Sequence, residues 1–189
     1  GWIATSPASI SVTLDCTGNQ TNKNFTNIPT GCISGYKIND CTDSGIPGWE
    51  ITISNNTYTT SMDTGPDGKY EFCGLMPGVY TVREESQSGW IATSPASISV
   101  TLDCTGNQTD KNFTNVPTGC ISGYKLNDCT KAGIPGWEIT ITNGTYTVSM
   151  DTGADGKYEF CGLMPGVYTV TEESQSGWIA TSPASISVT

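Results

Sequence analysis

Hydrophobic and polar residues alternate along this chain in short runs that are bounded by Gly, Pro, Asn or Asp. The runs are rich in Ile, Val, Thr, Tyr and Phe, which favour strands, and none has a helical period over a useful length. The predicted strands of the best-defined region are 33–39, 49–54, 57–63, 69–73, 79–84, 98–102 and 111–115. Seven short strands in so compact a stretch predict an all-β, Ig-like sandwich.

One of these runs, "GVYTVREE", ends in two carboxylates. Side chains at positions i, i+2 and i+4 of a strand lie on one face. Tyr80, Val82 and Glu84 therefore share a face, and a core position for the first two predicts a core position for Glu84. The adjacent Glu85 is predicted to point toward solvent.

The sequence repeats with a period of 88 residues, because "GWIATSPASISVT" begins at residue 1 and returns at residues 89 and 177. A period of this length is a domain-sized unit in a tandem array. Turns containing Pro and Gly predict linkers near 29–31 and 117–119.

These linkers predict three parts of the chain. Residues 1–28 are expected to be the closing strands of a preceding repeat, and residues 32–115 one complete sandwich. Residues 120–189 are expected to be a second sandwich that lacks its last strand. That strand is expected to come from continuing sequence or from the N-terminal strands of another copy.

Composition narrows the class of protein. A net charge of −10 provides no basic patch for nucleic acid, and no apolar run reaches the length of a membrane span. The eight cysteines show no paired C-x2-C spacing, so disulfides in an oxidising, extracellular compartment are expected rather than zinc. Six N-x-[ST] sequons mark candidate glycosylation sites, namely Asn19, Asn24, Asn55, Asn107, Asn112 and Asn143.

The sequence argues against an enzyme and indicates no cofactor. It contains no histidine, which excludes Ser-His-Asp, Cys-His and His-metal sites, and it contains no phosphate-binding glycine loop. Glu84 and Glu85 cannot flank one glycosidic bond, because adjacent strand residues face opposite sides.

Several motifs resemble a known family of surface domains. "ISGYKIND", "GIPGWEITI", "DTGPDGKYEFCGLMPGVYTVREE" and "KNFTN" are similar to the SdrD-type B repeats and CnaB-like (prealbumin-like, inverse Ig) domains of bacterial and archaeal surface proteins. The resemblance covers the whole repeat and implies a stalk, fibre or pilus module. It departs at the calcium loop, which is short here and replaces Asp43 by Lys131 in the second copy, so no metal is expected.

The strand order of that family implies a set of disulfides. Cys41–Cys73 and Cys129–Cys161 are expected within the two repeats, and Cys32–Cys104 is expected because first and last strands of this fold are neighbours. Cys16 and Cys120 are then expected to pair outside the fragment. The alternative, Cys104–Cys120 with Cys16–Cys32, must span a strand of roughly 23 Å, which exceeds the reach of a disulfide.

The resemblance also implies a self-formed isopeptide bond, since "GVYTVREE" is similar to the E-box of pilin domains. The implied triad is Lys37, Glu84 and Asn115, with Lys125 and Glu172 as counterparts in the next repeat and Asn27 closing the preceding one. The competing interpretation is that Lys37 reaches solvent, Asn115 caps the linker and Glu84 is only partly buried.

The leading functional prediction is a structural repeat of an extracellular stalk, fibre or filament, braced by disulfides and glycosylated. Its expected partners are neighbouring repeats or other copies of itself. The alternative is an adhesin module that binds a glycan or a partner protein. The aromatic residues Trp49, Trp90, Tyr36, Tyr70 and Tyr80 are expected to pack rather than to form a carbohydrate platform.

Overall fold

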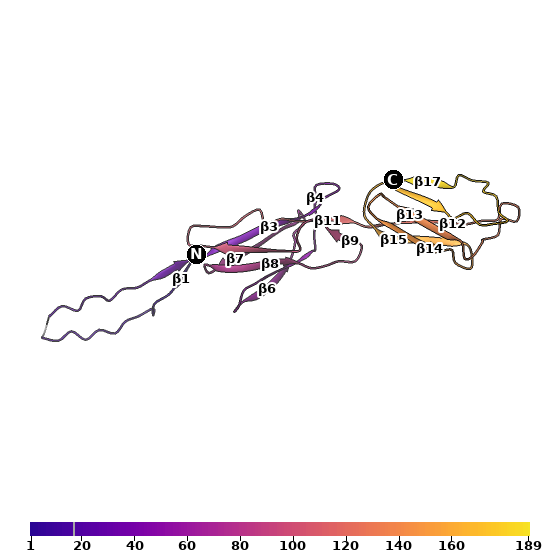
Figure 1. Ribbon diagram of the computed structural model, residues 1–189. Coiled ribbons are helices and arrows are strands. Elements are labelled where there is room, and N and C mark those ends of the chain that lie inside the picture. The colour runs from indigo at the N-terminus through magenta and orange to yellow at the C-terminus, as the bar shows by residue number, and fades with distance from the viewer. Residues whose placement is uncertain (17) are drawn as a thin grey trace. The chain divides into compact units, whose positions relative to one another are not determined.

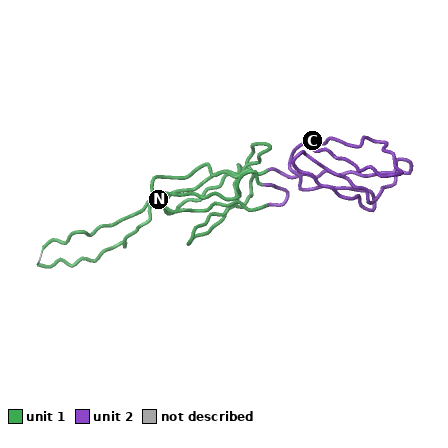
Figure 2. The backbone as a smooth tube through the Cα atoms, in the orientation of Figure 1, with its two compact units in different colours: residues 1–86, 92–115 green, residues 87–91, 116–189 purple. Residues whose placement is uncertain are grey.

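The computed structural model describes residues 1–16 and 18–189, and the only regular elements in these residues are strands. The chain divides into two compact units, coloured separately in Figure 2. Unit 1 comprises residues 1–86 and 92–115, and unit 2 comprises residues 87–91 and 116–189. The predicted all-β class is confirmed. None of the described residues forms a helix long and apolar enough to cross a bilayer.

The strands follow the short alternating runs of the sequence (Figure 1). They are β1 (Trp2–Ala4), β2 (Asn27–Pro29), β3 (Gly31–Asn39), β4 (Ser44–Gly45), β5 (Glu50–Ser54), β6 (Thr59–Asp63), β7 (Lys69–Leu75), β8 (Gly78–Glu84), β9 (Trp90–Ala92), β10 (Ser97–Leu102), β11 (Phe113–Pro117), β12 (Gly119–Tyr124), β13 (Glu138–Thr142), β14 (Thr147–Asp151), β15 (Lys157–Leu163), β16 (Tyr168–Glu172) and β17 (Ser185–Val188). The seven strands expected between residues 33 and 115 are all present, and β4 and β9 are short additions.

Unit 1 is built around two facing sheets. One has the order β10-β8-β5-β6, and the other contains β4-β3-β11, with β7 also paired to β3. The first strand of the sandwich, β3, therefore lies between β7 on one side and β11 on the other. The β3–β11 pair is parallel, with Phe113 opposite Lys37 and Asn115 opposite Asn39.

The alternating strand residues supply the core between these sheets. Trp49, Ile51 and Ile53 occupy successive inward positions and are fully buried, as is Phe113 on the opposite sheet. Full burial of side chains of this size contributes roughly 1.5–3 kcal/mol each to stability. The core is therefore continuous across the sandwich in the region where Lys37 enters it.

A close backbone approach closes one end of unit 1. A Cβ atom added to Gly45 would lie 1.9 Å from the carbonyl oxygen of Asp67. Only glycine allows the β4 segment to pass the turn "DTGPDGKY" at this distance. This contact fixes β4 against β3, beside Lys37.

Unit 2 has the same four-stranded arrangement but a smaller second sheet. Its strands pair in the order β14-β13-β16-β17, and β12 pairs with β15 alone. Its core contains Trp137, Ile139, Ile141, Phe160, Leu163, Tyr168 and Val170. Among the described residues, no strand takes the place beside β12 that β11 takes beside β3.

Residues 5–16 and 18–26 form a long excursion between β1 and β2, and none of these described residues belongs to a strand (Figure 1). β1 and β2 pair with each other, with Ala4 opposite Asn27. Apolar side chains of the excursion face solvent: Leu14 is 73% exposed and Phe25 is 60% exposed.

Candidate functional site

Three polar side chains meet inside the core of unit 1. Lys37 comes from β3, Asn115 from the neighbouring β11 and Glu84 from the end of β8 in the opposite sheet. Lys37 is 0% exposed, and Glu84 and Asn115 are each 3% exposed. Burying a polar side chain costs free energy unless it is hydrogen-bonded, so three buried polar side chains in one place are expected to interact with one another.

The ammonium nitrogen of Lys37 joins the three residues. Lys37 Nζ donates a hydrogen bond to Glu84 Oε2 at 2.5 Å and another to Asn115 Oδ1. The second carboxylate oxygen, Glu84 Oε1, is buried and has no hydrogen-bond partner. An ionised carboxylate with one unsatisfied oxygen is costly in an apolar core, which favours a protonated Glu84.

The strand positions explain why the side chains converge. Phe113 lies opposite Lys37 on the parallel strand, and Asn115 lies two residues further on the same face. Tyr80, Val82 and Glu84 of β8 are all buried, whereas Glu85 is exposed, as the alternation predicts. The interpretation that Lys37 reaches solvent is wrong for this structure.

Trp49 forms one wall of the site. The Lys37 ammonium lies 4.3 Å from the centroid of its ring, where a cation is attracted to the aromatic face. The ring is held in place because Trp49 Nε1 donates to the carbonyl oxygen of Glu85 at 2.9 Å. Sequence reasoning missed this residue as part of the site. The alternation of Trp49 with Ile51 and Ile53 in the sequence could have shown that its side chain points into the core.

Burial shifts both ionisable groups toward their neutral forms. It lowers the pKa of the Lys37 ammonium, and the hydrogen bond and charge of Glu84 oppose that shift only in part. It raises the pKa of the Glu84 carboxyl, again against the opposing effect of Lys37. A neutral amine is a nucleophile, and a neutral carboxylic acid is a proton donor. The site therefore places a nucleophile and an acid beside the carboxamide of Asn115.

Unit 2 contains counterparts of two members of this cluster, Lys125 for Lys37 and Glu172 for Glu84. Lys125 Nζ donates to Glu172 Oε2 and lies 4.2 Å from the centroid of the Trp137 ring. Their side chains are 15% and 14% exposed, more than those of Lys37 and Glu84. Asn27, the residue expected to close a preceding repeat, lies exposed in β2.

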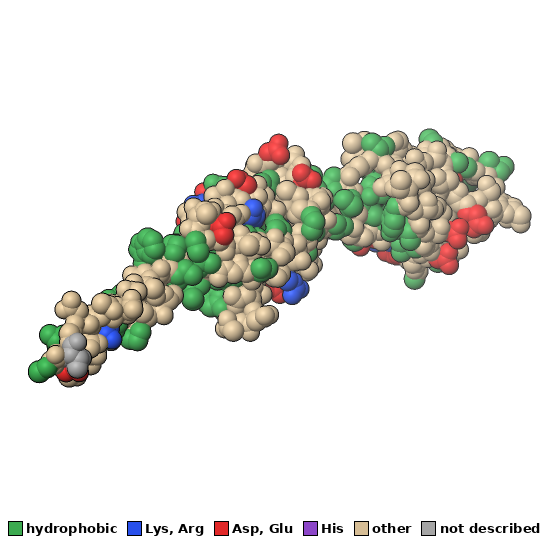
Figure 3. Space-filling model, turned by 60° about the vertical axis from the view of Figure 1, so that its left-hand side comes forward, with side chains coloured by type: hydrophobic (Ala, Val, Ile, Leu, Met, Phe, Trp, Pro, Cys, Tyr) green, Lys and Arg blue, Asp and Glu red, His purple; other side chains and the backbone are tan. Residues whose placement is uncertain are grey.

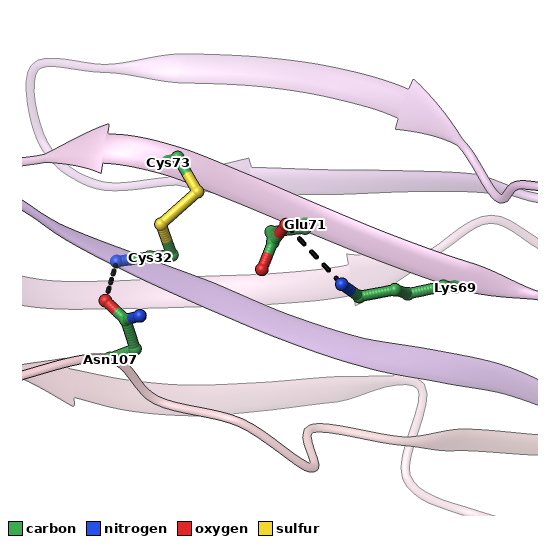
Figure 4. The surroundings of a disulfide bond; sticks show 5 residues. All are labelled: Cys32, Lys69, Glu71, Cys73 and Asn107. Atoms are coloured by element: carbon green, nitrogen blue, oxygen red, sulfur yellow. Dashed lines mark hydrogen bonds and ion pairs between the residues drawn. A yellow bond between two sulfur atoms is a disulfide. The ribbon is translucent and has the colours of Figure 1, made fainter.

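The disulfides differ from the predicted pairs. Cys32 is joined to Cys73, and Cys120 to Cys161, with Cα atoms 4.1 Å apart in each (Figure 4). The predictions Cys41–Cys73, Cys129–Cys161 and Cys32–Cys104 are therefore wrong, and Cys120 does not seek a partner outside the fragment. The reason is the sheet order: β7 is the antiparallel neighbour of β3, and a register shift between Gly31 and Ile33 sets Cys32 opposite Cys73. The exposed cysteines outside these bonds are Cys16, Cys41, Cys104 and Cys129.

Glu71 lies beside the first disulfide, and its carboxylate pairs with Lys69 at 3.5 Å (Figure 4). Cys32, Glu71 and Cys73 are close enough together to suggest a metal site. Thiolates are the sulfur ligands that metals bind, and both sulfurs here are in a disulfide. This cluster is therefore a brace between strands. In unit 2, Lys131 forms an ion pair with Asp128 at the surface.

Four of the six sequon asparagines are exposed, and Asn55 and Asn112 are half-buried. Asn19 and Asn24 are exposed in the excursion between β1 and β2. Asn107 and Asn112 accept hydrogen bonds from the backbone of β3, and Asn55 and Asn143 accept bonds within their own turns. Each of these bonds uses Oδ1, whereas a glycan is attached to Nδ2.

The aromatic residues mostly pack, as expected. Trp49, Tyr70 and Tyr80 are buried, Trp90 is half-buried and Tyr36 is 38% exposed. These five aromatic side chains therefore do not form a common exposed surface on which a carbohydrate could stack.

Two family models match the chain. Residues 34–125 match the SdrD B-like domain, and residues 119–189 match a prealbumin-like fold domain. Over 168 residues the chain is 32% identical to serine-aspartate repeat-containing protein F of Staphylococcus epidermidis, which covers 76% of this chain and 10% of the relative. It is 31% identical over 170 residues to serine-aspartate repeat-containing protein D of Staphylococcus aureus strain Newman, covering 77% of this chain and 13% of the relative. The chain thus spans only a small part of these curated relatives.

Solved structures with similar folds include the Bacillus anthracis TIE protein, with a TM-score of 0.48 and 19% identity over 84% of this chain and 31% of that chain. A streptococcal ancillary pilin matches with a TM-score of 0.43 and 18% identity, covering 85% of this chain and 59% of that chain. The family matches and curated relatives confirm the predicted resemblance and indicate an extracellular or cell-surface location. They support a structural or adhesin-related module of the cell surface.

Proposed function

We propose that this chain is a structural segment of an extracellular stalk or filament, in which residues 32–115 form one complete repeat. The proposal is supported by the match of residues 34–125 to the SdrD B-like domain and of residues 119–189 to a prealbumin-like fold domain. The near-identical repeats of the sequence support this proposal, since equal modules in series provide length. The exposed sequons at Asn19, Asn24, Asn107 and Asn143 are the proposed glycosylation sites of that surface. The matched families are structural and pilin domains rather than enzyme families.

We further propose that unit 1 is locked by a self-formed bond between Lys37 and Asn115. The observation that carries this proposal is the buried Lys37–Glu84–Asn115 cluster, with its amine directly beside the carboxamide. In this reaction neutral Lys37 Nζ attacks Asn115 Cγ, and the new C–N bond forms as the Cγ–Nδ2 bond breaks. Protonated Glu84 hydrogen-bonds the carboxamide oxygen as negative charge develops there.

The proton balance of this step needs no other reactant. The attacking amine gives up one proton, which Glu84 passes to the departing nitrogen, and the asparagine amide leaves as ammonia. Glu84 ends the reaction protonated, as it began. The proposed role of Glu84 is therefore that of an acid and proton carrier that acts once in the life of each domain.

The position of the bond suits a load-bearing module. β3 and β11 are parallel neighbours that open and close the sandwich, so a bond between them would join the first and last strands of the repeat. The disulfide joins β3 to β7 on the other side. With both bonds in place, β3 would be covalently joined to each of its neighbours, β7 and β11, and would resist separation from them under force.

Intact mass measured under reducing conditions tests this proposal. The wild-type chain is expected to be lighter than its sequence by one ammonia, and Lys37→Ala is expected to have the full mass of its own sequence. Glycans are removed enzymatically before the measurement. A wild-type chain of full sequence mass would contradict the bond, while leaving the stalk proposal to be judged by electron microscopy of assembled material.

A further inference from the structure

β10 differs from the other outer strands of unit 1 in having no feature that hinders pairing with another chain. The outer strand β7 carries Lys69 and Glu71, β6 ends at the exposed Asp63, and β4 has only two residues. Charged side chains and short length are features by which natural sheets protect their edges. β10 has six residues and contains no charged residue, proline or glycine. Its edge is therefore open to strand pairing.

One side of β10 is paired and the other is not. β10 pairs with β8, from Ser97 opposite Arg83 to Leu102 opposite Gly78. Among the described residues, no strand pairs with the side of β10 that faces away from β8, which is called the β10 edge below. Backbone N–H and C=O groups along an unpaired edge are a template for a further strand. All four strands of this sheet lie between residues 50 and 102, inside one repeat unit.

The two faces of β10 are each uniform in chemistry. The inward residues are aliphatic, namely Ile98, Val100 and Leu102. The outward residues are exposed and carry hydroxyl groups, namely Ser97, Ser99 and Thr101. Residues directly opposite each other in an antiparallel pair lie on the same face. A second β10 strand can therefore match this one, aliphatic to aliphatic and hydroxyl to hydroxyl.

Charge favours the β10 edge over the β6 edge for contact with a second copy. The chain has a net charge of −10, and Figure 3 shows Asp and Glu side chains on the surface of both units. At the β6 edge, Asp63 lies opposite Glu50, and Glu85 donates its backbone N–H to the carbonyl oxygen of Glu50. Three acidic residues on adjacent strands repel a second acidic chain there. At the β10 edge the nearest outward charge is the exposed Arg83, beside Ser97.

We propose that β10 of unit 1 pairs with β10 of a second copy of this chain, as antiparallel strands about a twofold axis through Val100. In this register Ile98 lies opposite Leu102 of the second copy, and Ser99 lies opposite its Thr101. The pairing joins the two sheets and continues their inward faces from one copy into the other. Main-chain hydrogen bonds supply the affinity, and the alternation of the side chains excludes a slip by one residue.

The same register brings opposite charges together. Asp103 follows β10 directly and is exposed, and it lies opposite Ser97 of the second copy. Because Arg83 is the neighbour of Ser97 on β8, Arg83 and Asp103 of the second copy are two strand spacings apart, roughly 10 Å between Cα atoms. An arginine and an aspartate side chain together span that distance. The twofold axis repeats this pair on its other side, as in any isologous contact.

Pairing through one strand of six residues buries little surface, so a single contact is expected to be weak. Repeats in series bring several such edges together, and each contact then raises the effective concentration of the next. Side-by-side association of stalks would be the consequence. That consequence rests on the proposed stalk function, whereas the pairing of two β10 strands does not.

The test uses the complete 189-residue chain in which the four exposed cysteines are replaced by serine, so that they do not cross-link copies. Sedimentation velocity over a concentration series is expected to show a reversible dimer. In the same background, Ser99→Cys/Thr101→Cys is folded and then oxidised with a small-molecule disulfide. The dimer should be trapped, and peptide mapping should find position 99 of one copy bonded to position 101 of the other.

Matched charge variants test the register. Ser99→Lys/Thr101→Lys places like charges directly opposite each other and is expected to abolish the dimer. Thr59→Lys/Ser61→Lys adds the same charge to exposed positions of β6 and is expected to leave the dimer unchanged. Mixing the β10 lysine variant with Ser99→Glu/Thr101→Glu should restore a dimer that contains one copy of each. The unfolding midpoint of each variant verifies that it is folded.

Three results would overturn the proposal. The first is a wild-type chain that stays monomeric at every concentration. The second is a dimer that the β6 and β10 lysine variants weaken equally, and the third is a trapped disulfide that does not join positions 99 and 101 of different copies. A dimer with the expected disulfide, but without side-by-side association in electron micrographs of assembled material, would support the strand pairing and contradict only its consequence for stalks.

Discussion

Lys37 and Asn115 are 78 residues apart in sequence, yet the Lys37 ammonium donates a hydrogen bond to the Asn115 carboxamide inside the core. They meet because β3 and β11 are parallel neighbours. Glu84 reaches the same ammonium from the opposite sheet. The three side chains thus connect both layers of the sandwich at a place shielded from water.

Replacing Glu84 tests its role as the acid. Glu84→Gln keeps the shape of the side chain but removes its dissociable proton, so we expect the Lys37–Asn115 bond to form far more slowly or not at all. A cross-link over this separation contributes about 4–5 kcal/mol in the chain-entropy model, and its absence should lower the free energy of unfolding by a similar amount. Intact mass and urea unfolding measure the two effects.

Glu85→Gln is the matched control, because Glu85 is adjacent in sequence but exposed. It should leave the mass loss and the unfolding midpoint unchanged. Equal behaviour of the two variants would remove Glu84 from the proposed chemistry.

The Cys32–Cys73 disulfide should stabilise unit 1 measurably. The bonded cysteines are 41 residues apart, and closing a loop of this size contributes about 4 kcal/mol in the chain-entropy model. Cys73→Ser should therefore lower the free energy of unfolding by about that amount, measured by urea denaturation of the unreduced protein.

Cys41→Ser serves as its control, since Cys41 is exposed and outside both disulfides. We expect no change in its unfolding midpoint. A loss of stability in Cys41→Ser as large as that in Cys73→Ser would favour the pairing that the sequence had predicted.

Tyr70 should make stability fall at alkaline pH. Its hydroxyl is buried and donates to the carbonyl oxygen of Lys111, and burial raises the pKa of this phenol well above its ordinary value. The folded state thus retains a proton that the unfolded state loses above about pH 10, so the stabilisation is complete below that pH and declines as pH rises through it.

Tyr70→Phe should flatten this alkaline decline and lower stability near neutral pH by about 1 kcal/mol through the lost hydrogen bond. Tyr36→Phe is the control, because Tyr36 is partly exposed. The measurement is urea unfolding at a series of pH values between neutrality and pH 11. An unchanged alkaline slope in Tyr70→Phe would contradict the assignment.

Much of the fold was predictable because strand alternation is a local property. The inward position of Glu84 follows from Val82 and Tyr80, which lie two and four residues earlier, and the outward position of Glu85 follows with it. Predicting the triad also required knowing that the first and last strands of the sandwich are neighbours. The family resemblance supplied that long-range information.

The cysteine pairing failed for a related reason. The neighbours of β3 were considered on the β11 side, whereas Cys73 lies on β7 at the other side of the same strand. Local sequence patterns identify the strands and their inward faces, but they do not show which strands lie side by side in a sheet. Trp49 was likewise assigned to packing, and only the assembled core shows its ring beside the Lys37 ammonium.

The most direct test of the covalent lock is fragmentation of the deglycosylated, reduced chain by a protease, followed by peptide sequencing in a mass spectrometer. We predict one branched peptide in which the Lys37 side chain is joined to the Asn115 side chain, with one ammonia lost. The same digest of Lys37→Ala should contain the two segments as separate linear peptides. Separate linear peptides carrying unmodified Lys37 and Asn115 from the folded wild-type chain would contradict the account.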